Sequence, residues 1–304
     1  MRLIIHGQQA FGKAVLEGLL DRNEEIAGVY CAPDVSDRRL DPLKELAIDV
    51  GLPILQPASY NDEDVQREMA DFSADLCVMA YVTLMVPEAV LNTPRLGSIQ
   101  YHPSLLPMHR GPSSINWPII FGEKRTGLSI FWPDHDIDTG PILLQKECSI
   151  GSDDTLGSLY FNHLFPMGVA AMLEAVDLVR EDKAPKMPQL KEKGSYEGWC
   201  RREESYIDWS RSAADVYNLI RGCDPQPGAW TVFDGIEIQL FDCRLGKAVS
   251  ATPGTILDAA DQLRIATGEG SIQFKKIRPK GDRKMDVEKF IFDYNVKKGM
   301  RISF

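Results

Sequence analysis

Short apolar runs alternate with helical stretches along the first hundred residues, and this alternation constrains the fold more than any other feature of the sequence. The apolar runs are residues 2–6, 26–31, 53–55 and 74–80. The first three are each followed by a stretch with helical spacing, or by a polar loop that leads into one. Strands separated by helices in this way form parallel sheets covered on both faces. We therefore predict an α/β fold with a doubly wound, Rossmann-like parallel sheet.

Three segments that could carry chemistry follow strands of this predicted sheet. An apolar loop, residues 81–87, follows the fourth strand, His102 ends the next one, and a strand predicted at 128–132 leads to Asp134. Ligands of such sheets bind beyond the carboxyl ends of the strands, so we expect the three segments to meet at one edge. A histidine and a carboxylate brought together there can transfer protons to and from a substrate.

The last third of the chain has a different pattern. Residues 184–206 are rich in Pro, Lys, Glu and Gly, which is typical of a linker. Short β-like runs follow a helical stretch, and the Asp-Gly at 234–235 between two of them indicates a hairpin. We predict a smaller C-terminal β-barrel (OB-like) domain with one helix. The predicted division is residues 1–190 for a catalytic domain, 191–206 for the linker and 207–304 for the barrel.

The charge balance disfavours a polyanion as partner. The chain has 304 residues and a net charge of -10, and nucleic-acid binding draws most of its affinity from neutralised phosphates. Residues 207–304 nevertheless carry 15 Lys and Arg against 13 Asp and Glu, most of them in 275–290 and 296–301. This basic strip could contact phosphate or could be the solvated edge of a sheet. We expect no DNA as partner and disfavour tRNA.

Several other classes of protein are also disfavoured. The six cysteines include no CxxC pair, so we expect neither a metal site nor a disulfide framework. The turn at 7–12 lacks the third glycine of a dinucleotide fingerprint and is not a P-loop. No apolar run approaches the roughly 18 residues of a membrane span, and the N-terminus has no signal-peptide pattern. We therefore expect a cytoplasmic protein with reduced thiols that binds neither metal nor membrane.

Two long motifs resemble the formyltransferases that use 10-formyltetrahydrofolate. HPSLLPMHRG begins at His102 and is followed by DHDIDTG, which begins at Asp134. The stretch IDWSRSAADVYNLIRGCDPQPGAWT, residues 207–231, is similar to the start of the C-terminal domain of methionyl-tRNA formyltransferase and its relatives. Within this superfamily, HGQQAFG, GSIQYHPSLLP and SIFWPDHDIDTGPILLQKEC are most similar to the N-terminal hydrolase domain of 10-formyltetrahydrofolate dehydrogenase. The resemblance implies a Rossmann-like catalytic domain and a folate as formyl donor.

The resemblance also implies roles for individual residues. His102 and Asp138 would be the catalytic acid-base pair, with Gln100 as a second donor to the oxyanion. Transferases of the superfamily usually have Asn at the position of Gln100, and the hydrolase domain has an aliphatic residue there. Gln keeps the amide donor on a longer stem, so this position leaves open the choice between formyl transfer and hydrolysis.

Folate and acceptor contacts follow from the same motifs. The folate slot would be lined by Leu84, Met85, Val86 and Ile137, with the backbone of the loop that holds Asp134 and Asp136 bonding the pterin. His109 and Arg110 are the acceptor-side candidates. They could bind an anionic group of the acceptor or the glutamate tail of the folate, because Arg is the usual partner of carboxylates. Water, a small amine and tRNA remain as candidate acceptors, and a catalytically silent folate-binding protein is a further alternative. We expect formyl transfer to water or to a small amine.

Overall fold

The computed structural model describes residues 1–35 and 39–302, so part of the loop after the second strand, residues 36–38, lies outside the described residues. The backbone divides into two compact units. The first contains Met1–Ser114, Gly127–Cys148 and Phe161–Glu197, and the second contains Ile115–Thr126, Ser149–Tyr160 and Gly198–Phe304. The chain crosses between the units several times. That the chain forms two compact units does not show which segments fold independently. The predicted division into residues 1–190, 191–206 and 207–304 therefore stays a prediction.

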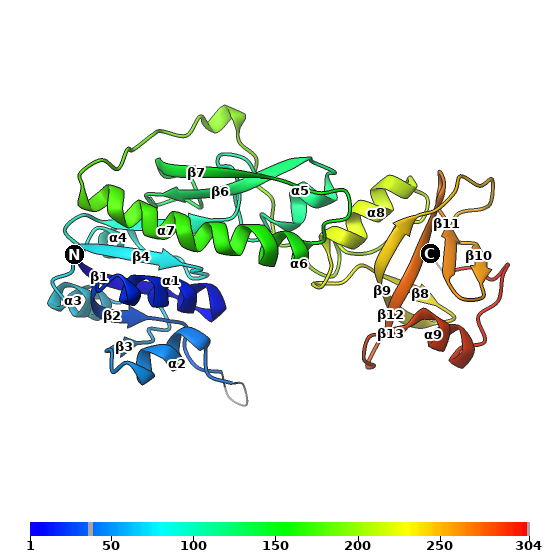
Figure 1. The fold of residues 1–304 in the computed structure, drawn as a ribbon, viewed down its shortest axis with the longest axis horizontal. Helices are drawn as coiled ribbons and strands as arrows, with labels where there is room; N and C mark the ends of the chain where they lie inside the picture. The colour runs from blue at the N-terminus through cyan, green and yellow to red at the C-terminus, as the bar shows by residue number, and fades with distance from the viewer. Residues whose placement is uncertain (36–38, 303–304) are drawn as a thin grey trace. The chain divides into compact units, whose positions relative to one another are not determined.

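A seven-stranded sheet forms the centre of the first unit (Figure 1). Its strands lie in the order β3-β2-β1-β4-β5-β6-β7, with the bounds β1 (Arg2–Gly7), β2 (Glu25–Tyr30), β3 (Ile54–Leu55), β4 (Leu76–Ala80), β5 (Ser98–His102), β6 (Arg125–Phe131) and β7 (Ile142–Ser149). The pairs from β3 to β5 are parallel, whereas β6 runs antiparallel to β5. The predicted parallel α/β sheet is therefore confirmed, and β6 is the strand that reverses direction.

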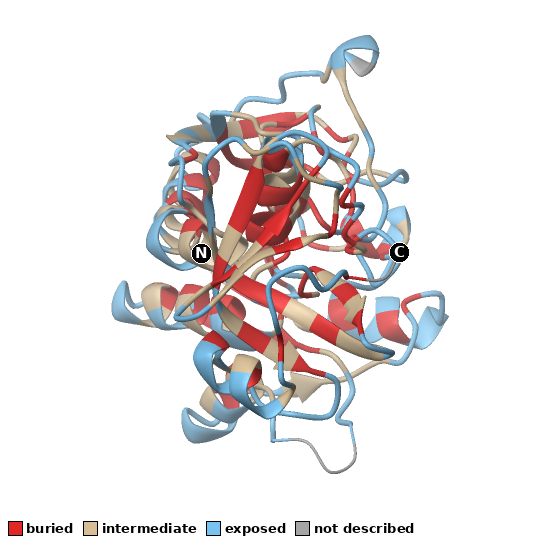
Figure 2. Cartoon of the chain, turned by 90° about the vertical axis from the view of Figure 1, so that its right-hand side faces the viewer, coloured by how far each residue is buried: buried red, intermediate tan, exposed pale blue. Residues whose placement is uncertain are grey.

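Helices cover both faces of this sheet. They are α1 (Gln9–Asp21), α2 (Pro42–Asp49), α3 (Glu63–Asp71), α4 (Glu88–Leu91) and α7 (Phe165–Arg180). Leu3 and Ile5 of β1 share an apolar cluster with residues of α1 and α7, and Ile4 between them belongs to a cluster with residues of α3. Successive strand residues point to opposite faces, so a sheet buried on both sides needs unbroken apolar runs such as β4. Figure 2 shows that buried residues gather on strands inside the fold and that exposed residues lie on the outer helices and loops.

Strand β5 presents different chemistry on its two faces. Ile99 and Tyr101 join the apolar cluster with α1 and α7. Gln100 and His102 alternate with them and therefore share the opposite face. The strand thus anchors the histidine in the core while it directs both polar side chains to one side of the sheet.

The apolar spacing of residues 153–181 predicts one long helix, capped by Ser152 or Asp153, and the structure divides it. Helix α6 (Leu156–Leu159) is followed by a π-helical turn, Tyr160–Leu164, and then by α7. Pro166 lies in the first turn of α7, where its missing N–H costs nothing, whereas in the helix interior it would break a hydrogen bond. The expected cap at Ser152 or Asp153 was wrong, because Thr155 caps α6 by accepting a hydrogen bond from the Ser158 N–H.

The second unit is built on an antiparallel sheet. Its order is β10-β11-β12-β9-β8, with β13 beside β12, and the bounds are β8 (Trp230–Phe233), β9 (Ile236–Leu245), β10 (Ile256–Ala259), β11 (Leu263–Ala266), β12 (Ser271–Pro279) and β13 (Met285–Asp286). The unit also contains α5 (Asn116–Ile120), α6, α8 (Ala213–Gly222) and α9 (Val287–Asp293). The predicted β-domain is confirmed as a curled antiparallel sheet, a half-barrel with β10 and β8 at its ends.

The predicted hairpin of this unit is also confirmed, since Phe233 and Ile236 pair across Asp234-Gly235. Strand β12 was missed because its lysines and arginine indicated only a basic strip. Its inward residues Ile272, Phe274 and Ile277 are fully buried. Within the described part of the chain, no helix is long and apolar enough to cross a membrane.

Candidate active site

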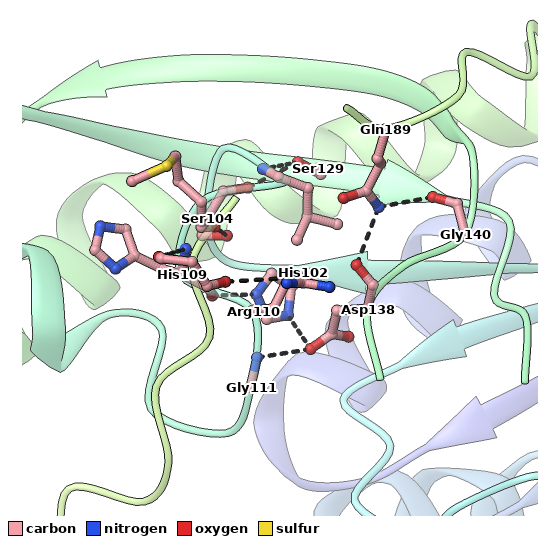
Figure 3. Close-up of polar contacts among 12 residues, drawn as sticks. His102, Ser104, His109, Arg110, Gly111, Ser129, Asp138, Gly140 and Gln189 are labelled. Carbon is pink, nitrogen blue, oxygen red and sulfur yellow. Dashed lines mark hydrogen bonds and ion pairs between the residues drawn. The ribbon is translucent and has the colours of Figure 1, made fainter. Parts of the chain in front are cut away.

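His102 and Asp138 are brought together, as predicted (Figure 3). The Nδ1 atom of His102 lies 3.5 Å from Oδ2 of Asp138, and both side chains are almost fully buried. His102 comes from the carboxyl end of β5, and Asp138 comes from the loop that joins β6 to β7. A buried imidazole beside a buried carboxylate is the arrangement that proton-transfer chemistry requires.

The second nitrogen of His102 determines which protons the ring can offer. Its Nε2 lies 2.9 Å from the carbonyl oxygen of His109. A carbonyl only accepts hydrogen bonds, so Nε2 must carry a proton and donate it. Nδ1 is therefore the nitrogen that is left for chemistry, and it faces the carboxylate of Asp138 (Figure 3).

Asp138 is held by two other segments of the chain. Its Oδ2 accepts a hydrogen bond of 2.9 Å from the Gly111 N–H. Its carbonyl oxygen accepts from Nε2 of Gln189, which also donates to the carbonyl of Gly140. Asp138 has φ of 56°, a left-handed conformation that Asp tolerates better than most residues. The carboxylate is thus fixed by its loop and by two distant segments.

The route by which Asp138 reaches His102 differs from the prediction. Because β6 is antiparallel to β5, with Gln100 opposite Phe131 and His102 opposite Ser129, the end of β6 lies toward the start of β5. The expectation that three carboxyl strand ends share one edge was therefore wrong for this strand. The loop after β6 turns back instead. Asp134 shapes the turn by accepting hydrogen bonds from the Asp136 N–H and the Thr139 hydroxyl.

A buried polar network fixes the loop after His102. The Ser104 hydroxyl donates to the Met108 carbonyl, and the Ser129 hydroxyl donates to the Ser104 carbonyl. The Ser129 oxygen also accepts from the Leu106 N–H and from Nε2 of Gln145. Ser104 thus fixes the loop that follows His102. Ser129 and Gln145 were missed, and the only signal for Ser129 was a hydroxyl within an apolar strand.

His109 and Arg110, the predicted acceptor-side residues, both bond to residues 195–197. His109 is 4% exposed, and its Nδ1 lies 3.2 Å from Oε2 of Glu197. Arg110 donates from Nε to the carbonyl of Ser195. This segment was taken as linker, and no local motif in it indicates a contact with the site. Gln189, on the same stretch of chain, was missed for the same reason.

The remaining predicted residues lie near the ends of β4, β5 and β6. Gln100 is half-buried on β5, and within the described residues its amide makes no hydrogen bond. Leu84, Met85 and Ile137 are exposed apolar residues, with 40%, 62% and 44% of their surface accessible, whereas Val86 is buried. Asp136 is exposed. Among the described residues, no group of three or more His, Cys, Asp or Glu side chains is arranged to hold a metal ion.

Comparison with known families agrees with this architecture in both units. The family described as formyl transferase matches residues 1–176, and the formyl transferase C-terminal domain matches residues 200–295. The chain therefore belongs to the formyl transferase family.

Two relatives illustrate its range. Human mitochondrial 10-formyltetrahydrofolate dehydrogenase is 38% identical over 281 residues, which cover 90% of this chain and 30% of that protein. Methionyl-tRNA formyltransferase of Alkaliphilus oremlandii (strain OhILAs) is 32% identical over 306 residues and is covered over 98% of both chains. The chain thus spans about a third of the length of the dehydrogenase and nearly all of the transferase.

Solved structures share the fold at lower identity. HypX from Aquifex aeolicus in complex with tetrahydrofolic acid has a TM-score of 0.71 at 19% identity, over 100% of this chain and 51% of that chain. The N-formyltransferase from Helicobacter canadensis in complex with folinic acid and dTDP-3-aminofucose has a TM-score of 0.68 at 17% identity, over 90% of this chain and 98% of that chain. At these identities the comparison establishes the fold alone.

Proposed function

We propose that this chain transfers the formyl group of 10-formyltetrahydrofolate to water or to an amine of a small molecule. The observation that carries the proposal is the buried pair of His102 and Asp138, 3.5 Å apart, in a member of the formyl transferase family. The names of both relatives, a 10-formyltetrahydrofolate dehydrogenase and a formyltransferase, support this donor and reaction. We further propose a cytoplasmic location.

The site residues suggest a mechanism without a covalent enzyme intermediate. Water or an amine attacks the formyl carbon, and the carbonyl π electrons move to oxygen, which forms an oxyanion. His102 acts in its doubly protonated form, so that Nε2 keeps its bond to the His109 carbonyl while Nδ1 donates a hydrogen bond to that oxygen. The amide of Gln100 is the second donor. Asp138 accepts the proton of the nucleophile through a water. Collapse of the intermediate breaks the bond between the formyl carbon and N10 of the folate, and Asp138 returns the proton to N10 through the same water. Loss of one oxyanion donor typically costs about 2.7–4 kcal/mol of transition-state stabilisation.

For the folate we propose a slot lined by Leu84, Met85, Val86 and Ile137. Three of these four apolar side chains are exposed, which supports their covering by a flat ring. The turn that Asp134 organises leaves the backbone of this loop as partner for the pterin, in line with the resemblance. Arg110 and His109 remain the proposed acceptor-side residues.

Methionyl-tRNA formyltransferase is the second candidate, because one such enzyme aligns over 98% of both chains. Binding of its acceptor, tRNA, would need a cationic surface on this chain. In the basic strip, however, Lys276, Lys280 and Lys284 form ion pairs with Asp286, Glu237 and Asp224. Charges that are already paired release fewer counterions on binding a polyanion. We therefore place the small acceptor first.

Tetrahydrofolate release is the measurement that separates these functions. The purified chain is incubated with 10-formyltetrahydrofolate alone, with an added panel of small amines, or with charged initiator tRNA. Release without acceptor supports hydrolysis, and release only with an amine supports transfer to a small molecule. Release that requires tRNA would contradict our proposal and support a methionyl-tRNA formyltransferase instead.

His102→Ala and Asp138→Asn test the site itself. Each variant should lower kcat by at least about 100-fold, because each removes a group that acts on the transition state. The exposed residues His163 and Asp261 provide the controls His163→Ala and Asp261→Asn, which should keep full activity. Circular dichroism and Tm should match the unsubstituted protein. Activity within about threefold of the controls in either site variant would show that the chemistry lies elsewhere.

A further inference from the structure

A short strap of chain, residues 195–197, runs beside the loop that follows His102. The Ser195 N–H donates to the carbonyl of Pro107, and the Arg110 N–H donates to the carbonyl of Ser195. The Glu197 N–H in turn donates to the carbonyl of Arg110. These bonds hold the strap parallel to residues 109–111, although more than 80 residues of sequence separate the two segments.

Two side chains of the strap hold His109 in particular. The Ser195 hydroxyl oxygen accepts a hydrogen bond of 2.9 Å from the His109 N–H. Oε2 of Glu197 lies 3.2 Å from Nδ1 of His109, and these side chains are only 15% and 5% exposed. His109 has φ of 53°, a conformation that a non-glycine residue keeps only where its surroundings enforce it. The strap holds His109 in this conformation through contacts with both its main-chain N–H and its side chain.

His109 connects this strap to the catalytic histidine. Its carbonyl oxygen is the acceptor, at 2.9 Å, for Nε2 of His102 (Figure 3). A rotation of the peptide after His109 would displace that acceptor, and the His102 ring would turn with it. The ring would then no longer present Nδ1 to Asp138.

We propose that Glu197 is a positioning residue for His102. Its carboxylate accepts the Nδ1 proton of His109 and fixes the left-handed backbone there. The His109 carbonyl then holds Nε2 of His102, so that Nδ1 points to Asp138 and to the reacting formyl group. The expected effect on catalysis rests on the function proposed above, whereas the effect on the His102 ring does not.

The test compares two substitutions of nearly equal size. Glu197→Gln keeps an oxygen that accepts from His109, and Glu197→Met fills the same space without an acceptor. In Glu197→Met we expect kcat to fall about 10- to 100-fold with KM for the folate changed less than about twofold, because misplacement of a catalytic group slows chemistry more than binding. Glu197→Gln should stay within about threefold of the unsubstituted kcat. Glu192→Met, at an exposed glutamate five residues away, is the control.

The second readout is independent of activity. The chain has five histidines, so single substitutions can assign the ¹⁵N and ¹H resonances of the His102 ring. Glu197→Met should shift the Nε2–H resonance of His102 and speed its exchange with solvent, while Glu197→Gln and Glu192→Met leave both unchanged.

The proposal is overturned if Glu197→Met leaves the His102 resonances where Glu192→Met leaves them, or if Glu197→Gln perturbs them as much as Glu197→Met does. If Glu197→Met does not fold, the spectrum of Glu197→Gln is compared with that of Glu192→Met, and a shift of the His102 resonances in Glu197→Gln alone overturns the proposal. Should the unsubstituted protein release no tetrahydrofolate while the resonances respond as expected, the proposed function fails and the positioning role stands.

Discussion

At the scale of single residues, His102 is constrained from two sides. Nε2 is committed to the carbonyl of His109, and Nδ1 faces the carboxylate of Asp138. The carboxylate of Asp138 is also held in place, because its Oδ2 accepts a hydrogen bond from the Gly111 N–H. Neither group needs to reorient before the reaction, and preorganised donors of this kind account for much of enzymatic rate enhancement.

Gln100 is the residue at which transfer and hydrolysis should diverge. Gln100→Asn should raise the ratio of formyl transfer to hydrolysis, since a shorter stem draws the amide donor back to the position usual in the transferases. Gln100→Ile should lower it, because no amide remains. Both ratios are measured as formylated amine against formate released from 10-formyltetrahydrofolate. Equal ratios in the two variants would show that this position does not select the acceptor.

At the scale of structural elements, the loop between β6 and β7 carries the acidic half of the site. Its two ends are tied by the hydrogen bond from the Trp132 N–H to the Pro141 carbonyl. Gln189 then bonds the carbonyls of both Asp138 and Gly140. The position of Asp138 therefore depends on how closely the backbone packs at Gly140.

Gly140→Ala should disrupt this loop. A Cβ atom there would lie 1.8 Å from the carbonyl oxygen of Trp132, so the backbone must move. We expect a loss of about 1–3 kcal/mol in the free energy of unfolding, as for overpacked sites. We also expect a loss of most tetrahydrofolate release. Urea denaturation and the release assay measure the two effects.

Gly198→Ala is the matched control, because no heavy atom of the described residues, other than those of its chain neighbours, lies within 4 Å of the Cβ it would add. Its stability and activity should equal those of the unsubstituted protein. A Gly140→Ala variant that behaves like this control would show that the loop has room to adjust.

At the scale of the whole molecule, burial of His6 couples folding to pH. His6 is 4% exposed, its Nε2 lies 2.8 Å from the Tyr60 hydroxyl, and burial lowers its pKa from 6.5 to about 3. Below pH 6.5 the unfolded chain gains a proton on His6 that the folded chain does not bind until about pH 3. Stability is therefore present in full above pH 6.5 and falls with pH through this window, by about 1.4 kcal/mol per pH unit.

His6→Gln should remove that dependence. Between pH 7.5 and 5.0 its free energy of unfolding should fall by about 2 kcal/mol less than that of the unsubstituted protein. The exposed His135 gives the control His135→Gln, which should keep the original slope. Urea denaturation at several pH values is the measurement, and an unchanged slope in His6→Gln would show that His6 binds its proton equally in both states.

Local pattern was sufficient for much of this protein. The spacing of apolar residues and the residue types that favour turns are both properties of neighbouring positions. The parallel sheet of β1 to β5 and the hairpin at Asp234-Gly235 could therefore be predicted. The β-like runs at residues 230–233 and 263–266 likewise predict strands, and the structure gives β8 and β11 these bounds. The motifs around His102 and Asp138 likewise contain the catalytic candidates within short stretches.

What only the tertiary structure decided is how those candidates are held. The reversed direction of β6 follows from pairing, and a single strand does not encode its direction in its own pattern. The groups that fix the site, Ser129, Gln189 and Glu197, lie 23, 51 and 88 residues from the groups that they bond. Their hydrogen bonds exist because folding buries polar atoms that must then find partners, and no local pattern predicts which distant partner is near. The sequence by itself determined the parallel strands of the sheet and the candidate groups of the site, and the folded chain determined their geometry.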